Sequence, residues 1–174
     1  MQAHLVHLIC GSTGAGKTTY ALRLSDQLGA VRFSIDEWMA ALFWMDTPKP
    51  LDAAWSTERV ERCRTQIWTV VLRIAPRNVP CVLDVGLGQA QSRARFAELA
   101  RHAGLSVQLH LLDLPVEERW RRVQARNAQK GETYQLGFEV TREMFDFIEG
   151  LWELPTEAEM LAYNGVLASV ATAL

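Results

Sequence analysis

The chain alternates between short apolar runs and longer stretches in which apolar residues recur every three or four positions. Runs of the first kind are typical of buried strands, and the second spacing is typical of amphipathic helices. The predicted strands are Leu5–Cys10, Val31–Ser34, Pro80–Asp84, Ser106–Leu112 and, after the Asn164-Gly165 turn, a last one near Val166–Val170. Helices are predicted from Ala21 to a cap at Gly29, from Trp55 to Ala75, from Ala90 to Gly104, from Pro115 to Asn127, and after a cap at Thr141. Strands that alternate with helices in this way predict an α/β fold with a mostly parallel, five-stranded sheet.

Three sequence features fall at the carboxyl ends of predicted strands, where an open parallel sheet binds its ligand. They are a glycine-rich segment after the first strand, Asp36 just after the second, and Asp84 at the end of the third. We therefore expect these features to meet at one edge of the sheet.

The segment that follows the first strand has the spacing of a phosphate-binding loop. Its predicted nucleotide-binding residues are Gly11, Ser12, Thr13, Gly14, Ala15, Gly16, Lys17, Thr18 and Thr19. Glycines allow successive backbone N–H groups to point inward at a β-phosphate, and the next helix adds its positive end. Lys17 is expected to reach the β/γ oxygens and Thr18 to hold Mg²⁺, so the sequence predicts a nucleoside triphosphate site.

Two aspartates are candidates for chemistry beside this loop. Asp36 is placed to accept the proton of an acceptor hydroxyl, with Glu37 as an alternative base. The competing interpretation is that Ser34 and Glu37 form a capping box and that Asp36 only favours the start of a helix. Asp84 ends an apolar strand and is expected to orient Mg²⁺ or contact the acceptor, although an acid at a strand end also forms turns.

The predicted helix after Pro115 carries Arg119, Arg122 and Arg126 on one face. Guanidinium groups in this arrangement suit triphosphate oxygens, while a solvated helix face is the alternative. A polar, glycine-containing stretch follows, so we expect a lid at about 119–140. Trp38 belongs to an aromatic group that forms either a wall around the acceptor or part of the core.

Composition narrows the choice of partners. The chain has 174 residues, 49% of them apolar, and no Pro/Gly/Ser-rich linker, which predicts a single domain over 1–174. A net charge of −2 disfavours a long nucleic-acid partner.

Cys10, Cys63 and Cys81 lack metal or disulfide spacing. With neither a signal peptide nor a run long enough to span a bilayer, a cytoplasmic protein that does not enter membranes is expected.

Taken together, the Gly-x-x-x-x-Gly-Lys-Thr loop, Ser-Ile-Asp36-Glu, Val-Leu-Asp84 and Arg122-Val-Gln-Ala-Arg126 resemble the small P-loop kinases. The nearest groups are AAA-type ATP-binding proteins that include zeta toxins, chloramphenicol phosphotransferase and polynucleotide 5′-hydroxyl kinases. The resemblance covers about residues 4 to 150 and implies a three-layer P-loop fold with a helical lid. It also implies that Asp36 contacts the acceptor hydroxyl, that Arg122 and Arg126 flank the donor phosphates, and that Arg93 contacts the acceptor.

The leading hypothesis is therefore a phosphotransferase that uses ATP and Mg²⁺ and acts on a hydroxyl of a small molecule. Lys17, Asp36, Arg122 and Arg126 are its predicted catalytic residues, and Trp38, Asp84 and Arg93 its further substrate contacts. A polynucleotide 5′-hydroxyl kinase is the first alternative, with Arg93, Arg95 and Arg101 as a local basic strip. An ATPase or nucleotide-dependent switch without an acceptor is the second.

Overall fold

A computed structural model describes residues 5–50, 52–128 and 139–169. Its sheet contains five parallel strands in the order β2-β3-β1-β4-β5, which confirms the predicted fold class. The strands are β1 (Val6–Cys10), β2 (Val31–Ser34), β3 (Cys81–Asp84), β4 (Val107–Leu111) and β5 (Val166–Leu167). The phosphate-loop strand β1 is thus the central strand of the sheet.

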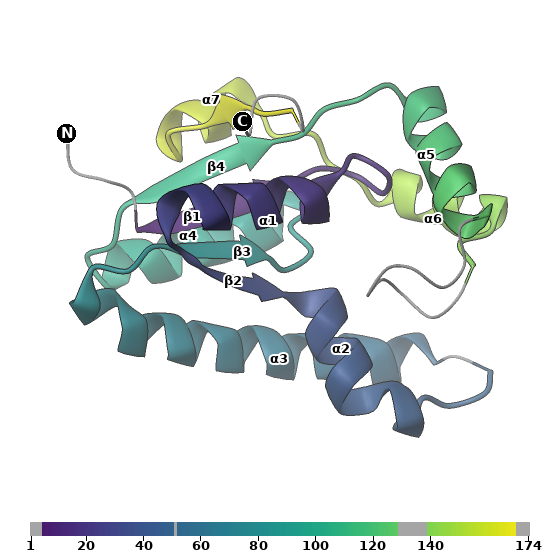
Figure 1. Cartoon of the computed structure of the whole chain (residues 1–174), viewed down its shortest axis with the longest axis horizontal. Helices are drawn as coiled ribbons and strands as arrows, with labels where there is room; N and C mark the ends of the chain where they lie inside the picture. The colour runs from purple at the N-terminus through teal and green to yellow at the C-terminus, as the bar shows by residue number, and fades with distance from the viewer. Residues whose placement is uncertain (1–4, 51, 129–138, 170–174) are drawn as a thin grey trace.

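Helices cover both faces of this sheet (Figure 1). The α-helices are α1 (Lys17–Leu28), α2 (Ile35–Phe43), α3 (Ala53–Ile74), α4 (Ala90–His102), α5 (Val116–Ala128), α6 (Arg142–Gly150) and α7 (Glu157–Ala162). Two short 3₁₀ helices, Trp44–Asp46 and Ala75–Arg77, follow α2 and α3. None of the helices within the described ranges is long and apolar enough to cross a membrane.

Side-chain alternation along the strands builds a separate apolar cluster on each face. Leu8 of β1 and Leu83 of β3 point to the cluster that α3 and α4 cover, where Ile67 and Phe96 are buried. Ile9 belongs to the opposite cluster, which packs against α1. The result is the three-layer arrangement that the resemblance implied.

Helices α5 and α6 lie beyond the carboxyl edge of the sheet (Figure 1). They pack on each other through a small cluster of Val123, Val140 and Phe145. Helix α5 and residues 139–140 belong to the predicted lid, while its part at 129–138 lies outside the described residues.

Capping chemistry explains where several helices begin. Ser34 ends β2 and also caps α2, because its hydroxyl accepts a hydrogen bond from the Glu37 amide at 3.4 Å. Helix α3 begins two residues earlier than the predicted Trp55, since the Asp52 side chain caps it. Helix α7 was not predicted, although Thr156 and Glu159 form a complete capping box at its start.

Candidate active site

The phosphate loop connects β1 to α1 at the centre of the sheet. Gly14 (φ 81°) and Gly16 (φ 91°) have left-handed backbone conformations that only glycine adopts without strain. Gly16 caps α1 without any side-chain hydrogen bond, so the first-turn amides of the helix remain available to an anion. Lys17 lies over this loop and donates a hydrogen bond from Nζ to the Ser12 carbonyl oxygen at 3.1 Å.

Thr18 and Asp84 meet beside the loop, as the sequence predicts for a magnesium site. The Thr18 hydroxyl donates to Oδ2 of the buried Asp84 at 3.3 Å. Burial raises the pKa of Asp84 above its ordinary value, although the Lys17 charge opposes the rise. Among the residues that the structure describes, no group of three or more His, Cys, Asp or Glu side chains is placed to hold a metal. One hydroxyl and one carboxylate nevertheless fit Mg²⁺, which keeps several water ligands and shares phosphate oxygens.

Asp36 occupies the first turn of α2 at the same edge of the sheet. Its residue retains solvent contact, yet the surrounding protein raises the pKa of its carboxyl above the ordinary value. Positive charge from Lys17 and Arg126 opposes this rise, and the neighbouring Glu37 adds to it. The structure therefore brings Asp36, Lys17 and Arg126 within electrostatic range of one another. The alternative base, Glu37, forms an ion pair with Arg32.

The three arginines predicted on one face of α5 have different surroundings. Arg126 is half-buried, and its pKa is lowered by burial while Asp36 opposes that change. Arg122 is exposed and pairs with Glu118 at 2.6 Å. Arg119 is buried and pairs with Glu149 at 2.7 Å, so it is not part of an open arginine surface.

Sequence reasoning missed a pocket of about 380 Å³ next to the phosphate loop. It is lined by Ala15, Arg23, Leu112, Asp113, Leu114, Arg122, Ala168 and Ser169. Its size falls in the range of small-molecule sites. Because Ala15 belongs to the loop and Arg122 to α5, this pocket adjoins the position expected for the rest of a bound nucleotide. No sequence motif identifies the segments after β4 and β5 as parts of a pocket. Their only sequence signal is their position at the ends of strands.

The structure places two predicted acceptor contacts elsewhere. Trp38 packs against the main core, and its ring lies 6.3 Å from that of Phe33, centroid to centroid, which favours the core interpretation. Arg93 is fully buried and binds the Glu159 carboxylate at 2.9 and 3.2 Å. It also donates to backbone carbonyl oxygens, the nearest being that of Glu153 at 2.8 Å. Arg93 therefore joins α4 to α7, and the prediction that it contacts an acceptor is wrong for this arrangement.

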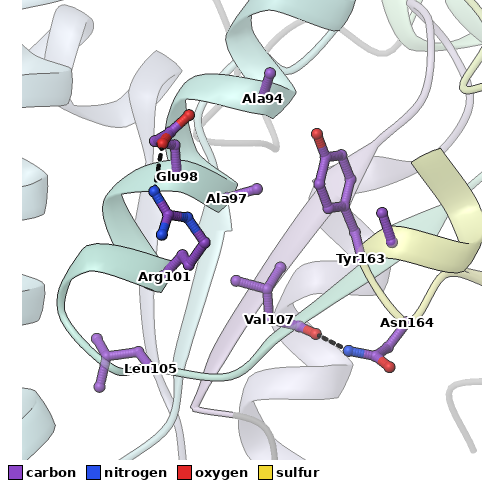
Figure 2. A pocket seen from close by; sticks show the side chains of 9 residues that line it. Ala94, Ala97, Glu98, Arg101, Leu105, Val107, Tyr163 and Asn164 are labelled. Atoms are coloured by element: carbon purple, nitrogen blue, oxygen red, sulfur yellow. Dashed lines mark hydrogen bonds and ion pairs between the residues drawn. The ribbon is translucent and has the colours of Figure 1, made fainter.

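A second hollow, of about 370 Å³, lies between α4 and α7. Figure 2 shows Tyr163 and Arg101 at its sides, with Glu98 paired to Arg101 and Asn164 bonded to Val107. Val107 begins β4, so this hollow lies at the amino-terminal edge of the sheet. It contains Arg101 of the predicted basic strip and none of the residues predicted for the phosphate loop.

A family model described as an AAA domain matches residues 6–151, which is most of the chain. The chain belongs to this AAA domain family. The match covers the loop, Asp36, Asp84 and both lid arginines, and it confirms the resemblance drawn from those motifs. No curated protein matches the chain in sequence.

Several solved structures of P-loop kinases and related proteins share the fold. A sugar kinase from Janibacter sp. HTCC2649 is 15% identical with a TM-score of 0.65, covering 97% of this chain and 87% of its own. Kti12 from Chaetomium thermophilum, in complex with ADP-AlF3, is 15% identical with a TM-score of 0.68 and coverages of 94% and 88%. The APS kinase CysC of Mycobacterium tuberculosis, in complex with AMPPNP and APS, is 16% identical with a TM-score of 0.62 and coverages of 99% and 95%. At these identities the similarity shows the fold alone, and this AAA domain protein has a P-loop kinase-like architecture.

Proposed function

We propose that this protein is a kinase that transfers the γ-phosphoryl group of ATP to a hydroxyl of a small molecule. The observation that supports the proposal is that Asp36, in the first turn of α2, lies within electrostatic range of Lys17 and Arg126 and that the surrounding protein raises the pKa of its carboxyl. A general base works best when its pKa approaches the working pH, so this environment suits proton acceptance from a hydroxyl.

Donor binding rests on the loop. Backbone amides of residues 11–19 would surround the phosphates, and Lys17 would exchange its bond to the Ser12 carbonyl for the β/γ oxygens. Thr18 and Asp84 would hold Mg²⁺, which neutralises charge on the phosphate oxygens when bound. The pocket beside Ala15 and Arg122 would receive the base and ribose.

Transfer then requires one proton acceptor and in-line positioning. The acceptor oxygen forms a bond to the γ-phosphorus, its proton passes to Asp36, and the bond from that phosphorus to the β–γ bridging oxygen breaks to release ADP. Arg126, and Arg122 once it leaves Glu118, would stabilise the negative charge on the transferred group. The solved neighbours include a sugar kinase and a complex with APS, which supports a small acceptor.

Ion pairing weighs against the polynucleotide alternative. Each arginine of the basic strip has a carboxylate partner: Arg93 pairs with Glu159, Arg95 with Glu61 and Arg101 with Glu98 (Figure 2 shows the last pair). Paired arginines offer little positive potential to a phosphate backbone. The ATPase alternative has no such observation against it and is separated by the experiment below.

The proposal is tested with Asp36→Asn and a matched control, Asp26→Asn, in an exposed position of α1. Calorimetry measures binding of Mg-ATP, and labelled ATP measures transfer to a panel of hydroxyl-bearing metabolites. We expect Asp36→Asn to keep its ATP affinity within about twofold and to lose at least roughly 100-fold in transfer, because it lacks the base. The control should retain both.

Three outcomes would contradict parts of this proposal. Undiminished transfer by Asp36→Asn would exclude Asp36 as the base. Transfer to a 5′-hydroxyl oligonucleotide at low salt, with none to metabolites, would favour the polynucleotide kinase. ATP hydrolysis that no acceptor in either panel accelerates would favour the ATPase.

A further inference from the structure

The buried Arg119 and the partly exposed Glu149 form an ion pair that joins α5 to α6. Two hydrogen bonds connect the side chains, from Nη2 to Oε1 at 2.7 Å and from Nη1 to Oε2 at 2.8 Å. Arg119 is 4% exposed, and its guanidinium also lies 5.6 Å from the centre of the Phe145 ring. This bidentate geometry fixes the relative position of the two helices.

The same pair holds the phosphate loop. Oε2 of Glu149 accepts a hydrogen bond from the Ser12 hydroxyl at 2.8 Å, and Nη1 of Arg119 donates to the Thr13 carbonyl oxygen at 3.3 Å. Nε of Arg119 donates to the carbonyl oxygen of Leu114 at 2.9 Å, and Leu114 lines the pocket next to the loop. One guanidinium thus contacts both the phosphate-binding segment and the wall of the adjoining pocket.

Backbone packing reinforces these bonds at Gly14. A Cβ at this position would lie 2.5 Å from the carbonyl oxygen of Arg119, a distance that only glycine permits. The first part of α5 is therefore seated directly on the loop. Any shift of α5 must be accompanied by a shift of the loop or by a break in this contact.

The negative charge of Glu149 is compensated by Arg119. A carboxylate bonded to Ser12 places negative charge next to the site proposed for a triphosphate, and Arg119 neutralises it. Burying the Arg119 charge and partly burying that of Glu149 is costly, and an apolar contact of the same shape often gives equal stability, so stability alone does not account for the pair.

We infer that Arg119 and Glu149 are positioning residues that hold Ser12 and Thr13 in the nucleotide-binding conformation. Through them, the position of α5, which carries Arg122 and Arg126, is tied to the shape of the phosphate loop. This inference rests on the proposed function, because it assigns the pair to the donor site of that reaction.

Three variants test the inference: Arg119→Met, the double variant Arg119→Met/Glu149→Leu, and Ser12→Ala. Calorimetry measures their affinity for Mg-ATP, and urea unfolding measures their stability. Arg119→Met should lose at least tenfold in affinity, because it leaves an unpaired carboxylate beside the loop. The double variant removes both charges, so it should regain stability without regaining affinity. Ser12→Ala should lose roughly threefold to tenfold in affinity with unchanged stability, the effect of one hydrogen bond.

The control is Arg101→Met, which breaks the exposed pair with Glu98 on α4 and should leave affinity unchanged. A double variant that recovers wild-type affinity together with its stability would overturn the inference, because the pair would then be structural only. Wild-type affinity in Ser12→Ala would overturn it as well, even if Arg119→Met does not fold. Failure of the wild-type protein to bind ATP would instead overturn the proposed function on which the inference rests.

Discussion

Acidic side chains in two regions of this protein have opposite electrostatic surroundings. At the carboxyl edge of the sheet, the surrounding protein raises the pKa of the solvent-exposed Asp36 and burial raises that of Asp84, and nearby cations only partly oppose both changes. In two ion pairs, one beside the phosphate loop and one between α4 and α7, hydrogen bonds from Arg119 and Arg93 lower the pKa of Glu149 and Glu159. The first pair of acids is left short of positive charge, and the second pair is fully compensated.

Under the proposed function, Asp36 and Asp84 act on bound ligands, whereas Glu159 joins α7 to α4 and Glu149 positions the phosphate loop. An acid kept near other acids in a poorly solvated place costs stability, and proteins retain such strain mainly at functional sites. Mg²⁺ would supply the charge that Asp84 lacks, and a hydroxyl proton would neutralise Asp36. The compensated acids need nothing further, and their role is to position helices.

The largest effect is expected from Lys17→Ala, which removes the cation that acts on both Asp36 and Asp84. Without this ammonium group, the triphosphate would lose its positively charged partner, and the two acids would repel it. We expect ATP affinity to fall at least roughly 100-fold by calorimetry, equivalent to about 2.7 kcal/mol. Lys49→Ala, at an exposed position, is the matched control. If Lys17→Ala bound ATP normally, the loop would not be the donor site.

A smaller effect on a different property is expected from Glu159→Gln. This change leaves the buried Arg93 without its compensating charge, although glutamine still accepts a hydrogen bond, so the free energy of unfolding should fall by about 2 kcal/mol in urea titrations. ATP affinity should stay within about twofold, because α7 contacts no part of the phosphate loop in the described contacts. Glu98→Gln, in an exposed pair, should leave stability unchanged. A loss of ATP affinity without a loss of stability in Glu159→Gln would return Arg93 to the active site.

The smallest effect is expected from Asp84→Asn, and it has the opposite sign. The variant should be more stable than the wild type at neutral pH without Mg²⁺, by about 1 kcal/mol, because it removes an undercompensated buried charge. Its ATP affinity should no longer increase when Mg²⁺ is added. A destabilised variant would show that Asp84 belongs with the compensated acids.

The dependence of this gain on pH follows from linkage. The ordinary pKa of Asp is 3.8, and the folded protein raises it at Asp84, so the folded state binds more protons above that pH. The stability of the wild type should therefore fall as the pH rises from about 4 through the folded pKa of Asp84. Asp84→Asn should reduce that slope. Glu149 and Glu159 contribute in the other direction: their stabilisation is present above the ordinary Glu value of 4.5 and is lost as the pH falls through their lowered pKa values.

Local patterns predicted most of the fold and the donor half of the site. The loop and the helix after it are predicted by residues that are close together in the sequence. The contact between Thr18 and Asp84 is predicted because the carboxyl ends of parallel strands lie at the same edge of a sheet. The strands at Val31–Ser34 and near Val166 were found because turns and apolar runs bound them.

Side-chain contacts between segments that are distant in the sequence could not be predicted from local patterns. In the local sequence, Arg93 looks the same as an arginine that faces a substrate. Its partner Glu159 lies on α7, a helix that the sequence pattern does not predict. Arg119 likewise has the spacing of Arg122 and Arg126, and only packing against Glu149 turns it inward. The capping box at Thr156 is a sequence signal for the start of α7, but no long periodic run of apolar residues follows it to indicate a helix.

The central place of β1 has a consequence for how this scaffold can change. Every residue of the strand is buried, and it bonds to a parallel neighbour on each side. Its amides should therefore exchange with solvent only when the whole domain opens, while α2 and the start of α3 can open locally. Under the proposed function, mutations in those outer helices would alter the surroundings of Asp36 without disturbing the strand that carries the phosphate loop.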